Sequence, residues 1–148
     1  MLTAAHCTIN EVESLRDPST LQVVTGEHDV TDSITDENRH QVASIMNHHL
    51  FDYSTFDHDI SILTLASMIR FSSTASPVCL PDPYFTYYWF PGYSDYIDQV
   101  ATVTGWGSTA YGESPSSTLQ EVNVTVISND ECSSAYGDRI KKYEKSIV

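Results

Sequence analysis

The sequence is poor in basic residues. Only 7 lysines and arginines stand against 20 aspartates and glutamates in 148 residues, which gives a formal net charge of -13. A charge of this sign repels phosphate backbones and anionic membrane surfaces. The sequence also contains no apolar run near the ~20 residues that a membrane-spanning helix needs. We therefore expect neither nucleic acid nor a membrane among the partners of this chain.

Common metal-binding and redox motifs are also missing. The three cysteines, Cys7, Cys79 and Cys132, lie far apart, and none belongs to a C-x-x-C pair. Because their number is odd, at least one thiol has no partner within the chain. Two interpretations stay open from the residues alone: buried free thiols, or disulfides whose partners lie elsewhere. The six histidines all lie within residues 6–58 without an HExxH motif, and their spacing predicts no zinc site.

The chain does contain many short β-like runs separated by turn residues. With 41% hydrophobic residues it has the material for a core, and a β-sandwich or barrel is expected. Residues 60–65 are apolar at nearly every position, as in a strand covered on both faces, whereas residues 119–127 alternate as in a half-exposed strand. A capping box at Ser128 and Glu131 predicts a short helix over residues 130–136. The other expected strands are residues 21–25, 42–46 and 100–104.

Four motifs follow one another along the chain. They are Leu2-Thr3-Ala4-Ala5-His6-Cys7, Asp57-His58-Asp59-Ile60-Ser61-Ile62-Leu63, Val78-Cys79-Leu80-Pro81 and Val103-Thr104-Gly105-Trp106-Gly107. In this order they resemble the histidine motif, the aspartate motif, the connection between barrels and the start of the second barrel in chymotrypsin/trypsin-like serine endopeptidases. The resemblance covers residues 2–142.

The resemblance implies an all-β fold of two antiparallel Greek-key barrels, present only in part. About residues 1–76 would form the first-barrel portion, 77–99 the connection between barrels, and 100–148 the second-barrel portion. In this family His6 would be the general base and acid, and Asp59 would orient its imidazole. The residue types agree, because an imidazole with a pKa of ~6.5 shuttles protons near neutral pH and a carboxylate beside a buried strand needs a partner.

The family's nucleophile is a serine in a Gly-Asp-Ser-Gly-Gly context, and no such string occurs in the sequence. We therefore expect a serine-type endopeptidase by resemblance, acting on protein or peptide substrates and bound by protease inhibitors, whose 148 residues are inactive alone. No cofactor is required for this chemistry. The competing interpretation is a non-catalytic protease homologue with a binding or regulatory role.

For the cysteines, the resemblance implies partners outside the chain. Cys7 would pair with an upstream cysteine, Cys132 with one beyond Val148, and Cys79 with an amino-terminal or propeptide segment. Residue Ala101 stands where the family has a further cysteine. The first residues lack the basic and apolar regions of a signal peptide. The chain is thus expected to be an internal part of a secreted, extracellular protease domain.

Three further features have open interpretations. Glu27 and Glu37 match the spacing of two carboxylates in the calcium loop of some family members, but Ile34 stands where a third is expected. The loop therefore either binds calcium or is a solvated acidic segment. Asn123 begins an Asn-Val-Thr glycosylation sequon. The aromatic stretch 84–96 either packs across the barrel interface or forms a binding surface.

Overall fold

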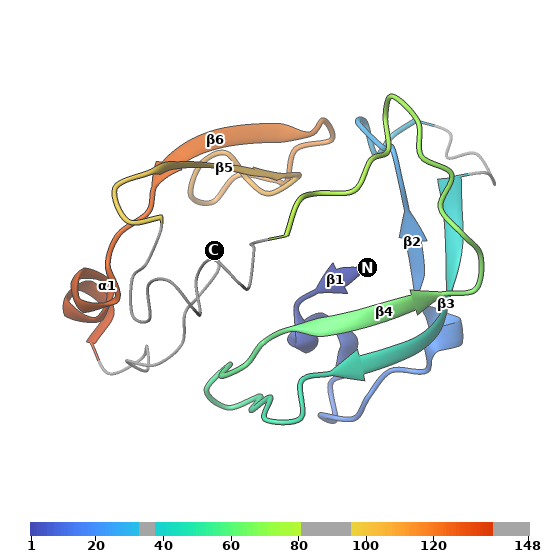
Figure 1. Cartoon of the computed structure of the whole chain (residues 1–148), viewed down its shortest axis with the longest axis horizontal. Helices are drawn as coiled ribbons and strands as arrows, with labels where there is room; N and C mark the ends of the chain where they lie inside the picture. Colours follow the sequence, from blue (N-terminus) through green and yellow to red (C-terminus); the bar gives the residue numbers. More distant parts are fainter. Residues whose placement is uncertain (33–37, 81–95, 138–148) are drawn as a thin grey trace. The chain divides into compact units, whose positions relative to one another are not determined.

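A computed structural model describes residues 1–32, 38–80 and 96–137 of the chain (Figure 1). Short antiparallel strands dominate these ranges, accompanied by two 3-10 turns and one short α-helix, so the all-β prediction is confirmed. The described chain divides into two compact units. Within the described ranges, no helix has the length and apolar character to cross a membrane.

The first unit contains a four-stranded antiparallel sheet in the order β1-β4-β3-β2. Each of the three strands expected here is present, and β3 begins three residues earlier than predicted. The register between β3 and β4 shifts between Val42 and Ser44, as at a β-bulge. The strands are β1 (Leu2–Thr3), β2 (Gln22–Val24), β3 (Arg39–Asn47) and β4 (Ser61–Leu65).

The core of this unit is small and lies on one face of the sheet. Its buried members are Val23, Val42 and Leu63, which come from three neighbouring strands. Partly buried Leu21, Ile45 and Leu65 pack against them. The prediction that residues 60–65 are covered on both faces is wrong. Burial alternates along β4, and Ile62 is 42% exposed because the described chain places no second layer over its face.

The second unit contains a two-stranded ladder of β5 (Val100–Gly105) and β6 (Gln120–Thr125), followed by α1 (Asn129–Tyr136). The predicted capping box is confirmed: Ser128 Oγ accepts a hydrogen bond from Glu131 N at 3.1 Å, and Glu131 Oε2 accepts one from Ser128 N at 3.1 Å. The expected buried face of β6 is absent, since every residue of the strand is exposed. A two-stranded ladder by itself supplies no second layer.

Residues 28–32 belong to the second unit although they precede most of the first. The carbonyl of His28 accepts hydrogen bonds from the Trp106 indole Nε1 at 3.1 Å and from Leu119 N at 2.8 Å. Val30 N donates to Ser117 O at 2.9 Å. The Gly-Trp-Gly motif at residues 105–107 therefore anchors a segment that lies far from it in sequence.

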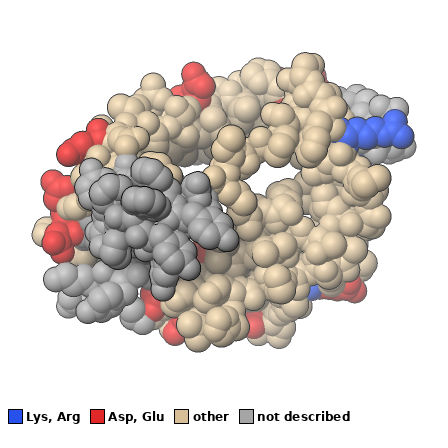
Figure 2. Space-filling view, viewed as in Figure 1, with Lys and Arg blue, Asp and Glu red and all other residues tan. Residues whose placement is uncertain are grey.

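Most of the acidic side chains in the described ranges are exposed, and Figure 2 shows red side chains around the outline of the face in view. Some of these carboxylates close local turns. Asp17 Oδ1 accepts a hydrogen bond from Ser19 N at 2.9 Å, and Asp29 Oδ1 accepts one from Thr31 N at 2.9 Å. Hydrogen bonds from Ser19 and Thr31 hold the pKa of each carboxyl below its usual value.

A pair of substitutions in β4 tests the position of the core. Leu63→Ala should lower the free energy of unfolding by about 2–5 kcal/mol, because it leaves a cavity in the buried cluster. Ile62→Ala is the matched control, since its side chain lies on the exposed face of the same strand, and should cost about 1 kcal/mol or less. Urea unfolding followed by circular dichroism measures both, and equal losses would contradict the one-sided core.

Candidate active site

The pairing of β1 with β4 brings His6 and Asp59 together. His6 lies in the 3-10 turn Ala5–Thr8, immediately after β1, and Asp59 lies two residues before β4. The strands are antiparallel, with Leu2 opposite Ile62 and Thr3 opposite Ser61. Extending this register by two residues places Asp59 opposite Ala5, next to His6. Two residues that are 53 positions apart in sequence thus meet at the end of a short ladder.

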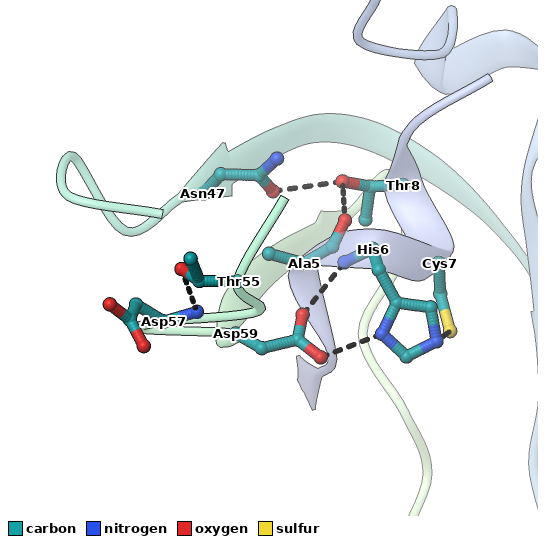
Figure 3. A network of polar contacts seen from close by, with 8 residues as sticks. All are labelled: Ala5, His6, Cys7, Thr8, Asn47, Thr55, Asp57 and Asp59. Atoms are coloured by element: carbon teal, nitrogen blue, oxygen red, sulfur yellow. Dashed lines mark hydrogen bonds and ion pairs between the residues drawn. The ribbon is translucent and has the colours of Figure 1, made fainter. Parts of the chain in front are cut away.

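Asp59 holds His6 through both of its carboxylate oxygens (Figure 3). Oδ2 lies 2.6 Å from the imidazole Nδ1, and Oδ1 accepts a hydrogen bond from the backbone N of His6 at 2.8 Å. A carboxylate only accepts hydrogen bonds, so Nδ1 is a protonated nitrogen, and in the neutral ring Nε2 is the nitrogen with the lone pair. The His6 side chain is 45% exposed and that of Asp59 is 22% exposed. The site therefore presents an oriented proton acceptor that solvent can reach.

Cys7 contributes a third group to this arrangement. Its Sγ lies 3.5 Å from His6 Nε2, on the side of the ring away from Asp59 (Figure 3). Because Nε2 has the free lone pair, the thiol is the donor in this contact. Cys7 and Cys79 are exposed free thiols and Cys132 is a partly buried one. The sequence suggested disulfide roles for these residues but did not suggest a contact between Cys7 and the imidazole.

Residues that sequence analysis missed support the turn that carries His6. Thr8 is 1% exposed and its hydroxyl donates to Ala5 O at 2.7 Å, while lying 2.9 Å from Asn47 Oδ1 at the end of β3. Phe56 places its ring edge-on to the His6 imidazole, with ring centroids 5.5 Å apart. The sequence gives no signal that singles out Phe56, because the same loop also contains Leu50, Phe51 and Tyr53.

The loop between β3 and β4 holds a row of three imidazoles. The His48 ring contacts both of the others. It stacks on the His58 ring with centroids 4.7 Å apart, and its centroid lies 4.7 Å from that of His49. His48 Nδ1 accepts a hydrogen bond from Leu50 N at 3.2 Å, which requires this nitrogen to be unprotonated. Partial burial, then the nearby His49 and His58, hold the pKa of His48 below the usual histidine value. Within the described ranges, no group of three potential ligands is arranged to hold a metal ion.

The calcium loop, the aromatic stretch and the glycosylation sequon are the other predicted sites. Glu27 lies in the first unit, whereas Glu37 and residues 84–95 fall outside the described residues, so the calcium loop and the aromatic surface stay predictions. Asn123 lies on exposed β6, and its Oδ1 accepts a hydrogen bond from Thr102 Oγ1 at 2.9 Å. Its glycosylation also stays a prediction.

Comparison with known proteins gives consistent similarities along most of the chain. A family model described as Trypsin matches residues 1–146. Trypsin-1 of Astacus astacus is 34% identical over 136 residues, which are 92% of this chain and 52% of that protein. The proclotting enzyme of Tachypleus tridentatus is 32% identical over 139 residues, covering 92% of this chain and 36% of that protein. Serine protease filzig of Drosophila melanogaster is 32% identical over 134 residues, or 89% of this chain and 7% of that protein. The chain thus spans about half or less of the length of these relatives.

The role of Asp59 in fixing the imidazole tautomer can be tested directly. Asp59→Asn should move the His6 proton from Nδ1 toward Nε2, because an amide no longer requires a donor at Nδ1. Two-bond proton–nitrogen NMR spectra of histidine-labelled protein report the tautomer. Asp32→Asn, which removes a carboxylate from residues 28–32, is the control. An unchanged tautomer in Asp59→Asn, or the same change in the control, would contradict the assignment.

The lowered pKa of His48 predicts a dependence of stability on pH. The unfolded chain protonates His48 more readily than the folded chain does. The folded state therefore has its full stability above pH ~6.5 and loses stability as the pH falls below that value. His48→Asn keeps an acceptor for Leu50 N but does not titrate, and should reduce the loss of stability between pH 7.5 and 5.5. Urea midpoints at both pH values measure the effect, and identical pH dependence in wild type and His48→Asn would refute it.

Proposed function

The chain belongs to the trypsin family of serine proteases, and we propose that it supplies the general base, His6, and the orienting carboxylate, Asp59, of a secreted Ser-His-Asp endopeptidase. Its two antiparallel sheets are part of the β-barrel fold of that family. One observation carries the proposal: the two-oxygen contact of Asp59 with His6, at 2.6 and 2.8 Å. A binding protein would need neither this contact nor the orientation of the imidazole that results from it.

In the proposed reaction His6 Nε2 takes the proton of a serine hydroxyl as that oxygen attacks the substrate carbonyl. The proton is then returned to the leaving amine, so that the imidazole alternates between base and acid. Asp59 keeps Nδ1 protonated throughout and stabilises the positive charge that forms on the ring. The edge-on ring of Phe56 limits rotation of the imidazole on its open side.

These 148 residues do not identify the nucleophile, because they contain no Gly-Asp-Ser-Gly-Gly string. A base cannot replace a covalent nucleophile, so we propose that the 148-residue chain is inactive alone and that activity needs a serine supplied from outside it. Names such as trypsin-1 and proclotting enzyme among the relatives support protein substrates, and protease inhibitors are proposed as further partners.

Activity of the longest product of the transcript tests this proposal. We expect codons beyond residue 148 to contain the Gly-Asp-Ser-Gly-Gly sequence and the product to react with a fluorophosphonate probe, whereas the 148-residue chain does not react. Asp59→Asn should lower kcat for a peptide substrate by about 10⁴-fold, the size known for this substitution in related Ser-His-Asp enzymes. Glu121→Gln, which removes an exposed carboxylate on β6, should leave kcat unchanged.

The competing proposal is a non-catalytic homologue. It is favoured if the transcript encodes another residue, such as glycine, at the nucleophile position and the product neither reacts with the probe nor cleaves peptides. In that case the tautomer held by Asp59 would still be present, so the NMR result and the activity result are independent.

A further inference from the structure

We propose that Thr8 and Asn47 are positioning residues for the pair of His6 and Asp59 (Figure 3). They act through the peptide group between Ala5 and His6, which joins their hydrogen bonds to those of the pair. The inference rests on the proposed function, because the positioned groups are the base and the carboxylate named there. Its main tests measure the geometry of the pair and need no serine nucleophile.

The hydroxyl of Thr8 has two polar neighbours but only one proton. It lies 2.7 Å from Ala5 O and 2.9 Å from the side-chain amide of Asn47. A carbonyl oxygen cannot donate, so the hydroxyl proton lies between Thr8 and Ala5. The contact with Asn47 is then a hydrogen bond only when the amide donates, and in the proposed chain Asn47 presents Nδ2 to Thr8. Half a turn of the amide provides this orientation, and it breaks no other hydrogen bond of the Asn47 side chain within the described residues.

The peptide group between Ala5 and His6 is held at both ends. Its carbonyl belongs to Ala5 and accepts from the Thr8 hydroxyl, whereas its N–H belongs to His6 and donates to Asp59 Oδ1 at 2.8 Å. The group is planar and rigid, so fixing the direction of the carbonyl also fixes the direction of the N–H. Donation to the carbonyl also makes the N–H of the same group a stronger donor. Asp59 is thereby aligned with Oδ2 against the imidazole Nδ1.

Burial leaves this role to the protein rather than to water. Ala5 is 0% and Thr8 1% exposed, so solvent does not reach the contact between them. The pair itself is open, since the side chains of His6 and Asp59 are 45% and 22% exposed. A hydrogen bond lost in a buried position has no substitute from water. The orientation of the pair therefore depends on contacts from its buried side.

Two substitutions of Thr8 test the hydroxyl in the 148-residue chain. Thr8→Val keeps the shape of the side chain and removes the donor. It should speed hydrogen exchange of the His6 backbone amide by about five- to tenfold and shift the low-field NMR signal of the His6 Nδ1 proton. Thr8→Ser keeps the donor and should leave both close to wild type.

Thr25→Val is the matched control. It removes a hydroxyl that lies 3.2 Å from His40 Nε2 in the same unit and has no contact with the proposed chain. Neither signal of His6 should change in this variant. Wild-type signals in folded Thr8→Val, or the same changes in Thr25→Val, would overturn the proposal.

Asn47→Asp tests the direction of the amide. At pH 7.5 the new carboxylate only accepts, so it draws the Thr8 hydroxyl proton away from Ala5 O. The His6 amide should then exchange as fast as in Thr8→Val. As the pH falls through ~4 the new carboxyl group is protonated and can donate, and the exchange rate should return to within about twofold of wild type at the same pH. A wild-type rate at pH 7.5 would overturn the proposed chain.

A measurement on the wild type keeps the proposal falsifiable even if a variant does not fold. With Nδ2 toward Thr8, nuclear Overhauser effects should connect the Asn47 amide protons with the Thr8 side chain. Their absence from an assigned spectrum would overturn the proposal.

Catalysis gives a separate test in the longer product that carries the nucleophile. Thr8→Val should lower kcat by about tenfold and leave KM within about twofold, because the base is misaligned while substrate contacts are kept. An unchanged kcat would overturn the positioning role. A wild-type product without activity would refute the proposed function instead, and the exchange rates would still decide between the outcomes for Thr8.

Discussion

The antiparallel register between β1 and β4 is the constraint on which the site depends. β1 has only two residues, yet its pairing with Ile62 and Ser61 determines that His6, which follows β1 in sequence, lies next to Asp59. A slip of β4 by one residue would move Asp59 away from His6 and exchange the faces of β4. The slip is opposed by burial of Leu63 in the core and by the buried Thr8 hydroxyl near Asn47. A small apolar cluster and one buried polar contact therefore set the position of the imidazole.

Much of this architecture could be predicted from the sequence because the motifs are local. The runs that became β2 to β6 and the capping box at Ser128 all have signals within a few residues. Contacts that depend on a second segment could not be predicted in this way. The Phe56 ring on His6 and the contact of Thr8 with Asn47 join residues whose own neighbours give no hint of the partner. The exposure of Ile62 was missed for the same reason, since covering a strand face depends on other segments.

The position of residues 28–32 has a consequence for how the chain is made. The bond from Trp106 Nε1 to the His28 carbonyl spans 78 positions, and residues 38–76 emerge from the ribosome between the two partners. During synthesis from the amino terminus, residues 28–32 lack these hydrogen-bond partners until residues 106–119 have been added to the chain. Closing the loop between these segments costs little additional entropy, because each doubling of loop length costs only ~0.6 kcal/mol, but the loop closes late in synthesis. The two units are therefore not successive halves of the translated chain, and a cut between them at residue 76 would separate the second from part of its own structure.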